Sequence, residues 1–212
     1  MVDEWEERYE ERKSHSEKLK NGLRIRIFGP YAGDCSYILT SVADRITQEE
    51  GYDAKTCLSV PDVRSLSEIE KGPTYNWEAS LQCIRFGIVG VFVFMKAKRE
   101  RFGEWGPFAH PNKYSNRKSS TQELNSSVVL EFSEWLNQSP QNEDVLVIYE
   151  DDMEDVLGSL ILGRVEEGEI TTREITTSGW GDTVNSIVRA ICGQCQFWMT
   201  NLKPVIDSQL DD

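Results

Sequence analysis

The stretch Val89-Gly-Val-Phe-Val-Phe-Met95 (VGVFVFM, residues 89–95) decides the fold, because it is a continuous apolar run without a charged side chain. Its length and its β-branched and aromatic residues predict a strand that is buried on both faces. Such strands are typical of the centre of a parallel sheet that helices cover on both sides. We therefore expect strands and helices to alternate along the rest of the chain.

Shorter apolar segments predict four more strands, at residues 23–28, 52–58, 145–149 and 169–175. Apolar residues recur at helical spacing in the segments between them, which predicts helices over 36–50, from about 75 to 88, over 124–138, up to Leu162 and over 180–202. Helix-length crossovers between strands predict parallel pairing. The expected fold class is therefore α/β, a three-layer, doubly wound (flavodoxin-like or Rossmann-like) domain with a mostly parallel five-stranded sheet.

The expected domain organisation is simple. Residues 1–20 are polar on most faces, with Trp5 and Tyr9 one helical turn apart, which predicts an appended N-terminal helix. Residues 21–212 then form a single α/β domain, interrupted by a long polar loop over 96–120. Loops of that length are usually functional lids or disordered segments.

Composition and charge limit the kinds of partner that the protein is expected to have. The net charge of −13, from 36 acidic and 23 basic residues, opposes binding to nucleic acid, and Lys96, Lys98, Arg99 and Arg101 read as a solvated loop. Strong acidity is also compatible with a halophilic source. No segment reaches the roughly 18 apolar residues of a membrane span, so we expect no membrane association and a cytoplasmic protein.

The cysteines favour a reducing compartment and packed thiols rather than a metal or redox centre. There are five, and Cys192-Gly-Gln-Cys195 is a lone CxxC without a second CxxC or a nearby histidine. The motif also lies in a helical apolar stripe. We therefore expect core cysteines, no metal and no cofactor.

Glu131 is the first candidate functional residue, because it carries a charge where the helix over 124–138 should be apolar. Leu124, Val128, Phe132 and Trp135 form the apolar stripe, and at 100° per residue Glu131 projects into it. A buried carboxylate is costly unless it is paired or used in chemistry. The alternatives are an ion pair with Arg24, Arg26 or a partner subunit, or a position at the rim of the stripe.

Two short motifs resemble a known family. Gly29-Pro30-Tyr31, between the first strand and a helix, resembles the opening of nucleoside 2-deoxyribosyltransferase-like proteins, which share their architecture with TIR-type NAD-cleaving domains. That family carries Asp-x-Gly-Thr-x-x-Glu, with a nucleophilic Glu, after its central strand. Here Asn125-Ser-Ser127-Val128-Val129-Leu130-Glu131 has the same spacing, with Asn125 in place of Asp and Ser127-Val128 in place of Gly-Thr. The resemblance covers about residues 23–150.

The resemblance implies cleavage or transfer of the N-glycosidic bond of a nucleoside, nucleotide or NAD-like substrate. A carboxylate can stabilise or trap the cationic sugar of such a reaction. Glu131 would be the nucleophile or stabiliser, and Asn125 the second catalytic residue. The implied substrate-binding residues are Gly29, Pro30, Tyr31, Asp34 and Ser127. The family also implies a homodimer in which the neighbouring subunit completes the site.

Departures from the family keep a second hypothesis open, that of a catalytically inactive nucleotide-sensing or protein-interaction module of the same fold. Asn125 cannot exchange a proton as the family's Asp can. Ser120-Thr-Gln-Glu123 resembles a capping box, which would start the helix earlier and place Asn125 inside it. Phe86-Gly87 stands where the family often has an acid; Asp34 is either its substitute or a helix N-cap. His110 reads as an exposed loop residue.

Overall fold

The computed structural model describes residues 22–30, 33–57, 77–96, 121–138, 142–151, 153, 170–176 and 179–210. The strands are β1 (Arg24–Phe28), β2 (Asp53–Thr56), β3 (Val89–Phe94), β4 (Val145–Glu150) and β5 (Thr171–Ile175). The helices are α2 (Gly33–Arg45) with its extension η1 (Ile46–Glu50), α4 (Trp77–Phe86), α5 (Thr121–Gln138), the short η4 (Asn142–Asp144), α7 (Trp180–Asn201) and α8 (Lys203–Leu210). The predicted helix over 1–20, the loop after Lys96 and the helix up to Leu162 lie outside the described residues.

The five strands form one sheet in the order β2-β1-β3-β4-β5, and every neighbouring pair is parallel. The predicted α/β fold with its parallel five-stranded sheet is therefore confirmed. The central strand β3 lies between β1 and β4, with Val91 opposite Ile27 on one side and Leu146 on the other. This order is the doubly wound arrangement found in flavodoxin-like proteins.

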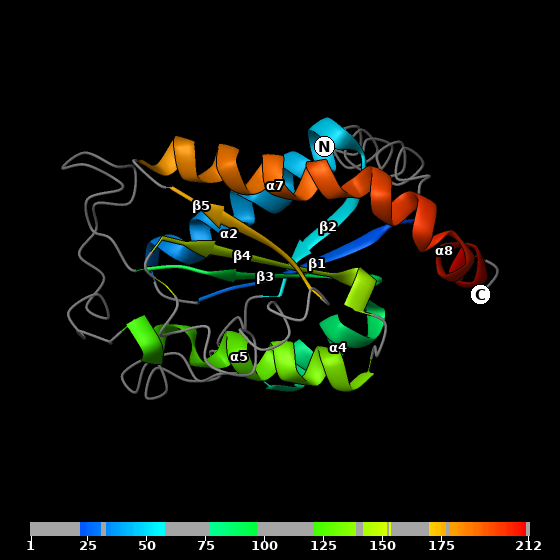
Figure 1. The fold of residues 1–212 in the computed structure, drawn as a ribbon, viewed down its shortest axis with the longest axis horizontal. Helices are drawn as coiled ribbons and strands as arrows, with labels where there is room; N and C mark the ends of the chain where they lie inside the picture. Colours follow the sequence, from blue (N-terminus) through cyan, green and yellow to red (C-terminus); the bar gives the residue numbers. More distant parts are fainter. Residues whose placement is uncertain are drawn as a thin grey trace, which may run out of the picture.

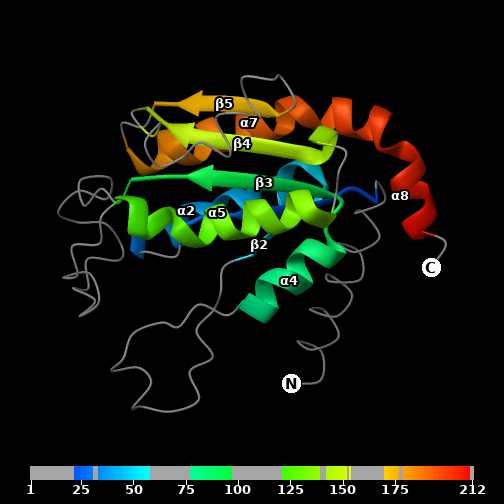
Figure 2. The same cartoon turned by 60° about the horizontal axis from the view of Figure 1, so that its bottom comes forward.

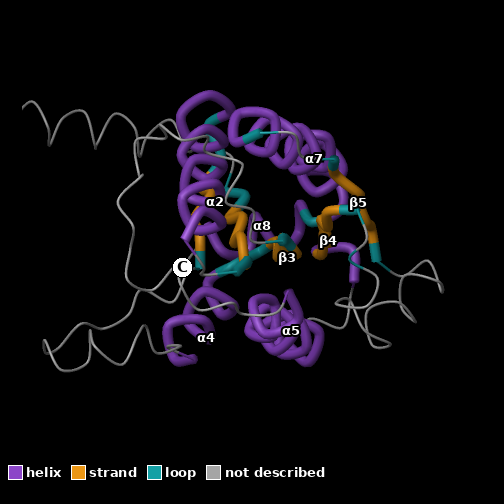
Figure 3. The backbone as a smooth tube through the Cα atoms, turned by 90° about the vertical axis from the view of Figure 1, so that its left-hand side faces the viewer, coloured by secondary structure: helices purple, strands orange, loops and turns teal. Residues whose placement is uncertain are grey.

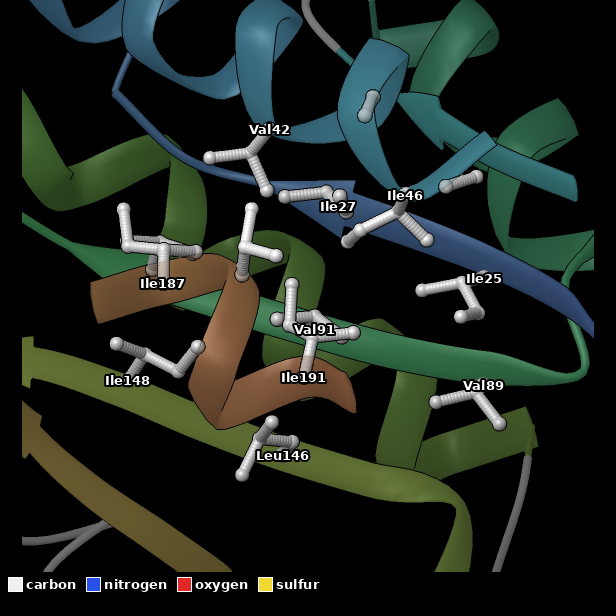
Figure 4. Close-up of a cluster of buried hydrophobic side chains, with 14 of the residues drawn as sticks. Ile25, Ile27, Val42, Ile46, Val89, Val91, Leu146, Ile148, Ile187 and Ile191 are labelled. Atoms are coloured by element: carbon white, nitrogen blue, oxygen red, sulfur yellow. The ribbon is translucent and has the colours of Figure 1, made fainter. Parts of the chain in front are cut away.

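Helices cover both faces of the sheet, in three layers (Figures 1 and 3). The helices α2 and α7 lie on one face, and α4 and α5 lie on the other. Alternate side chains of the strands point to the two faces. Those directed toward α2 and α7 form an aliphatic core, of which Figure 4 shows Ile25, Ile27, Val42, Ile46, Val89, Val91, Leu146, Ile148, Ile187 and Ile191.

The core beneath α4 and α5 contains a cluster of aromatic rings among aliphatic side chains, and we call it the aromatic core. The rings of Phe28 and Phe92 stack with centroids 4.8 Å apart, and Trp135 of α5 meets both edge-on. Trp135 fits because two glycines leave room for its ring: a Cβ atom on Gly90 would lie 2.8 Å from it, and one on Gly87 2.7 Å. The indole Nε1 of Trp135 also donates to the Asp144 carboxylate at 3.2 Å.

The end of the chain differs from the prediction. The last helix was expected to stop at residue 202, but α7 ends at Asn201 and the chain continues into α8. Pro204 occupies the first turn of α8, where the missing N–H of proline costs nothing. None of the described helices is long and apolar enough to cross a membrane.

Candidate functional site

The carboxyl ends of the parallel strands lie at one edge of the sheet, which we call the carboxyl edge; Figure 2 shows β3, β4 and β5 pointing toward it. The chain leaves β1 toward α2 on one face, whereas it leaves β3 toward α5 on the other. In doubly wound sheets ligands bind outside the strand ends at such a switch point. The described residues at the switch point are Gly29 and Pro30 after β1 and Met95 and Lys96 after β3.

Asn125 fixes the end of β3. Its Oδ1 accepts a hydrogen bond from the backbone N–H of Met95 at 3.0 Å, and its Nδ2 donates to the Met95 carbonyl at 2.9 Å. Both residues are fully buried. The side-chain amide of Asn125 therefore shapes the carboxyl edge by binding the backbone there.

Glu150 holds the next residue from the other side. Its carboxylate, at the end of β4 and fully buried, accepts a hydrogen bond from the backbone N–H of Lys96 at 2.5 Å. The ammonium group of Lys96 donates to the carbonyl of Asp151, also at 2.5 Å. The buried carboxylate of Glu150 is thus matched by a backbone donor from the end of the neighbouring strand. Two successive residues after β3 are fixed by their neighbours.

Gly29 and Pro30 form the β1 side of the switch point, and both are buried. A Cβ atom on Gly29 would overlap the side chain of Leu39 and lie 3.4 Å from the carbonyl oxygen of Val93. A larger residue at position 29 would therefore force the Leu39 side chain to shift. Tyr31 lies outside the described residues.

Glu131 is buried as predicted, with 2% of its surface exposed, but it does not lie at the carboxyl edge. Its Oε1 accepts a hydrogen bond from the Ser80 hydroxyl at 2.5 Å, where α5 packs on α4. Six residues of helix separate it from Asn125, which corresponds to about 9 Å along the axis of α5. The two proposed catalytic residues therefore have different partners, the Ser80 hydroxyl for Glu131 and the Met95 backbone for Asn125.

Arg26, one of the possible ion-pair partners of Glu131, is paired with Asp53. Its guanidinium donates to the Asp53 carboxylate at 3.1 Å and to the Asp53 carbonyl at 3.2 Å. Arg26 has 4% of its surface exposed. This pair joins β1 to β2 on the face that α4 and α5 cover.

The remaining predicted site residues are spread over several elements. The helix α5 begins at Thr121, so the earlier start that the capping box predicted is confirmed, and Asn125 lies inside the helix. This start weakens the match to the family motif. Ser127 is half-buried on α5. Asp34 is the second residue of α2; its side chain and His110 lie outside the described part of the chain.

Sequence reasoning missed Ser80, Lys96 and Glu150 as members of buried polar contacts. Glu150 had a usable signal, since it is the first charge after the apolar strand VLVIY. Ser80 had none, because its contact depends on how α4 crosses α5. Among the described residues no group of three or more His, Cys, Asp or Glu side chains is arranged to hold a metal ion.

The CxxC motif packs as expected. Cys195 belongs to the aliphatic core and donates to the Ile191 carbonyl at 3.4 Å, and Cys192 packs against that core. The neighbouring Cys195 thiol lowers the pKa of Cys192, whereas the contact with Cys192 and burial raise the pKa of Cys195.

Comparison of the chain with protein-family models, curated proteins and solved structures found no match.

Proposed function

We propose that this protein is a small-molecule-binding module that holds a nucleoside or nucleotide at the carboxyl edge between β1 and β3, without breaking its glycosidic bond. We take it to be a cytoplasmic homodimer. The supporting observation is the use of Asn125, whose amide hydrogen-bonds both backbone groups of Met95. Such a contact builds a rigid strand end, which favours binding, and it occupies the polar atoms that a catalytic residue would offer to a substrate.

Titration calorimetry of the full chain with a panel of nucleosides, nucleotides and NAD tests the proposal. We expect a saturable heat with at least one member and quantitative recovery of that ligand, with its base still attached, by chromatography. Absence of heat across the panel, or release of free base, would contradict it.

A matched pair of lysine variants locates the site. Lys96→Ala removes a side chain at the switch point, and Lys203→Ala removes one from the distant helix α8, where it pairs with Asp207 at 3.1 Å. Lys96→Ala removes the contact with the Asp151 carbonyl and so loosens the end of β3. We expect it to weaken binding by about tenfold or more, or about 1.4 kcal/mol, and Lys203→Ala to leave binding unchanged. Equal affinities in both variants would place the site elsewhere.

The buried carboxylate of Glu131 favours a second candidate, cleavage or transfer of an N-glycosidic bond. A carboxylate in an apolar setting can stabilise a cationic sugar strongly. On this proposal the wild-type protein releases base from a member of the panel, and Glu131→Gln lowers turnover by about 100-fold or more. Ser133→Ala, on the same helix, is the control. No base release by the wild-type protein removes this candidate and leaves the binding module.

A further inference from the structure

Two thiols from distant parts of the sequence meet where the end of β2 approaches α4. Cys57 directly follows β2, and its backbone N–H donates to the Ile27 carbonyl at 2.9 Å, which fixes its position. Cys57 has 4% of its surface exposed and belongs to the aromatic core, whereas Cys83 of α4 packs against that core and remains partly accessible.

The two thiols interact directly. Hydrogen bonding between the two side chains lowers the pKa of Cys83 to about 7. Burial and the same hydrogen bond raise the pKa of Cys57 well above its usual value. One thiol therefore ionises easily and is accessible, and the other stays protonated and buried beside it.

The surrounding charges favour a thiolate at Cys83. Arg26, buried on β1, and Lys55, exposed on β2, both lower its pKa. Lys55 and Cys57 lie on the same face of their segment because they are two residues apart. Asp53 balances the two cations, with contacts of 3.1 Å to Arg26 and 3.7 Å to Lys55. The charge of Glu131 also opposes ionisation of Cys57.

We propose that Cys57 and Cys83 form a reversible, peroxide-reactive dithiol, with Cys83 as the attacking thiol and Cys57 as the resolving thiol. The oxidant is a hydroperoxide. The Cys83 thiolate attacks one peroxide oxygen, the O–O bond breaks, and protonation gives a sulfenic acid and water or an alcohol. The Cys57 sulfur then attacks the Cys83 sulfur, the disulfide forms, and the hydroxyl group leaves as water with the Cys57 proton. A dithiol reductant restores both thiols by exchange.

Oxidation of this pair would have a structural effect that the CxxC pair cannot have. A bond between Cys192 and Cys195 would remain within α7, whereas one between Cys57 and Cys83 ties a sheet strand to a helix and closes a loop over residues 58–82. The product would fix α4 on β2, beside the face that carries Ser80 and Glu131.

Peptide mapping of the full chain tests the proposal. The protein is treated with hydrogen peroxide, remaining thiols are blocked with N-ethylmaleimide, and the chain is digested with trypsin. Cys57 falls in peptide 56–64 and Cys83 in peptide 72–85, whereas Cys192 and Cys195 share one later peptide. We expect a linked species of peptides 56–64 and 72–85, lighter by two hydrogens than their sum, which dithiothreitol separates. Absence of this species in the wild-type protein would overturn the proposal.

Variants assign the two roles. Dimedone, which labels sulfenic acids, is present during peroxide treatment of two single variants. We expect the label on Cys83 in Cys57→Ser to exceed the label on Cys57 in Cys83→Ser by at least about tenfold. The reason is that an accessible thiolate reacts with peroxide and a buried thiol does not. The double variant Cys192→Ser/Cys195→Ser should form the linked species as the wild type does. Stronger labelling of Cys57 would overturn the assignment. If a single variant fails to fold, brief dimedone trapping in the wild-type protein, with the label expected on Cys83, decides the same question.

Discussion

The side-chain amide of Asn125 bonds to both backbone groups of Met95, as a residue of a neighbouring strand would. Met95 directly follows β3, so α5 continues the hydrogen-bonding pattern of the sheet by one residue beyond the strand. The Glu150 carboxylate then takes the backbone N–H of Lys96. The end of the central strand is therefore held by a helix on one side and by β4 on the other.

The two hydrogen bonds between the Asn125 amide and the Met95 backbone, which we call the clamp, make Asn125→Asp an informative substitution. Asp restores the residue that the family motif has, yet its carboxylate cannot donate to the Met95 carbonyl, which would stay buried without that donor. We expect a loss of about 1–3 kcal/mol in the free energy of unfolding. Urea denaturation measures this loss. Asn185→Asp, at an exposed site beside Arg45, is the control and should change stability by less than about 0.5 kcal/mol; equal effects would rule out the clamp.

The contact between α4 and α5 predicts a cost for Ser80→Ala. The Ser80 hydroxyl donates to the buried Glu131 carboxylate, so its removal should cost about 1.5–3 kcal/mol, typical of a hydrogen bond to a charged group. Ser133→Ala on α5 is matched in chemistry, but Ser133 donates to the Val129 carbonyl at a half-buried site. It should cost less than about 1 kcal/mol. Thermal melts of both variants measure the difference, and equal melting temperatures would show that the Ser80 bond contributes little.

Glycine substitutions test the packing of Trp135. A Cβ atom on Gly90 would lie 2.8 Å from the Trp135 ring, so Gly90→Ala should cost about 1–3 kcal/mol through overpacking. At Gly193, in the interior of α7, a Cβ atom would meet nothing within 4 Å. Gly193→Ala should therefore stabilise the protein by about 0.5–1 kcal/mol. Denaturant midpoints measure both changes, and a neutral Gly90→Ala would mean that Trp135 can shift.

The alkylation rate of Cys83 should depend on pH near neutrality. Its pKa is about 7 instead of 9.0, and the thiolate is the reactive form, so the rate should rise with pH and reach half its maximum near pH 7. Iodoacetamide labelling followed by mass spectrometry of peptide 72–85 measures this profile. In Cys57→Ser a hydroxyl group replaces the thiol beside Cys83, and its shorter C–O bond changes the contact. The pH of half-maximal alkylation of Cys83 should therefore shift in this variant. A half-maximum near pH 9 in the wild-type protein would contradict the hydrogen-bonded thiol pair.

Local patterns were sufficient to predict the fold. The apolar run at 89–95 became the central strand, and the four other predicted strands agree with the observed ones within two residues at each end. Helical spacing similarly located α2, α4, α5 and α7. These signals are local because each strand or helix must turn its own apolar residues toward the sheet or the core. The prediction contained no helix after residue 202, although a proline is compatible with the first turn of a helix such as α8.

The site was less predictable, because its contacts join residues far apart in the sequence. The inward direction of Glu131 followed from helix periodicity and is confirmed, but its contact with Ser80 depends on the packing of α4 on α5. Asn125 was predicted to be a catalytic residue from the spacing of a motif. Its partner in the structure is the backbone of Met95, and almost any residue type at position 95 would offer the same backbone groups. Sequence patterns of side chains carry no information about such backbone partners.

The difference between the two faces of the sheet has a consequence for amide hydrogen exchange. The face under α2 and α7 is a continuous aliphatic core, so its amides should exchange only when the whole domain unfolds. On the other face, α4 is held by fewer apolar contacts. Among its described side chains, Ile84 and the half-buried Cys83 pack into the aromatic core, and Ser80 bonds to the Glu131 carboxylate. We expect α4 to open at a lower free energy than α7 and to exchange sooner. An opening of this kind would also expose the Cys57 sulfur to solvent, so the oxidation state of the thiol pair and the rate of exchange in α4 should change together.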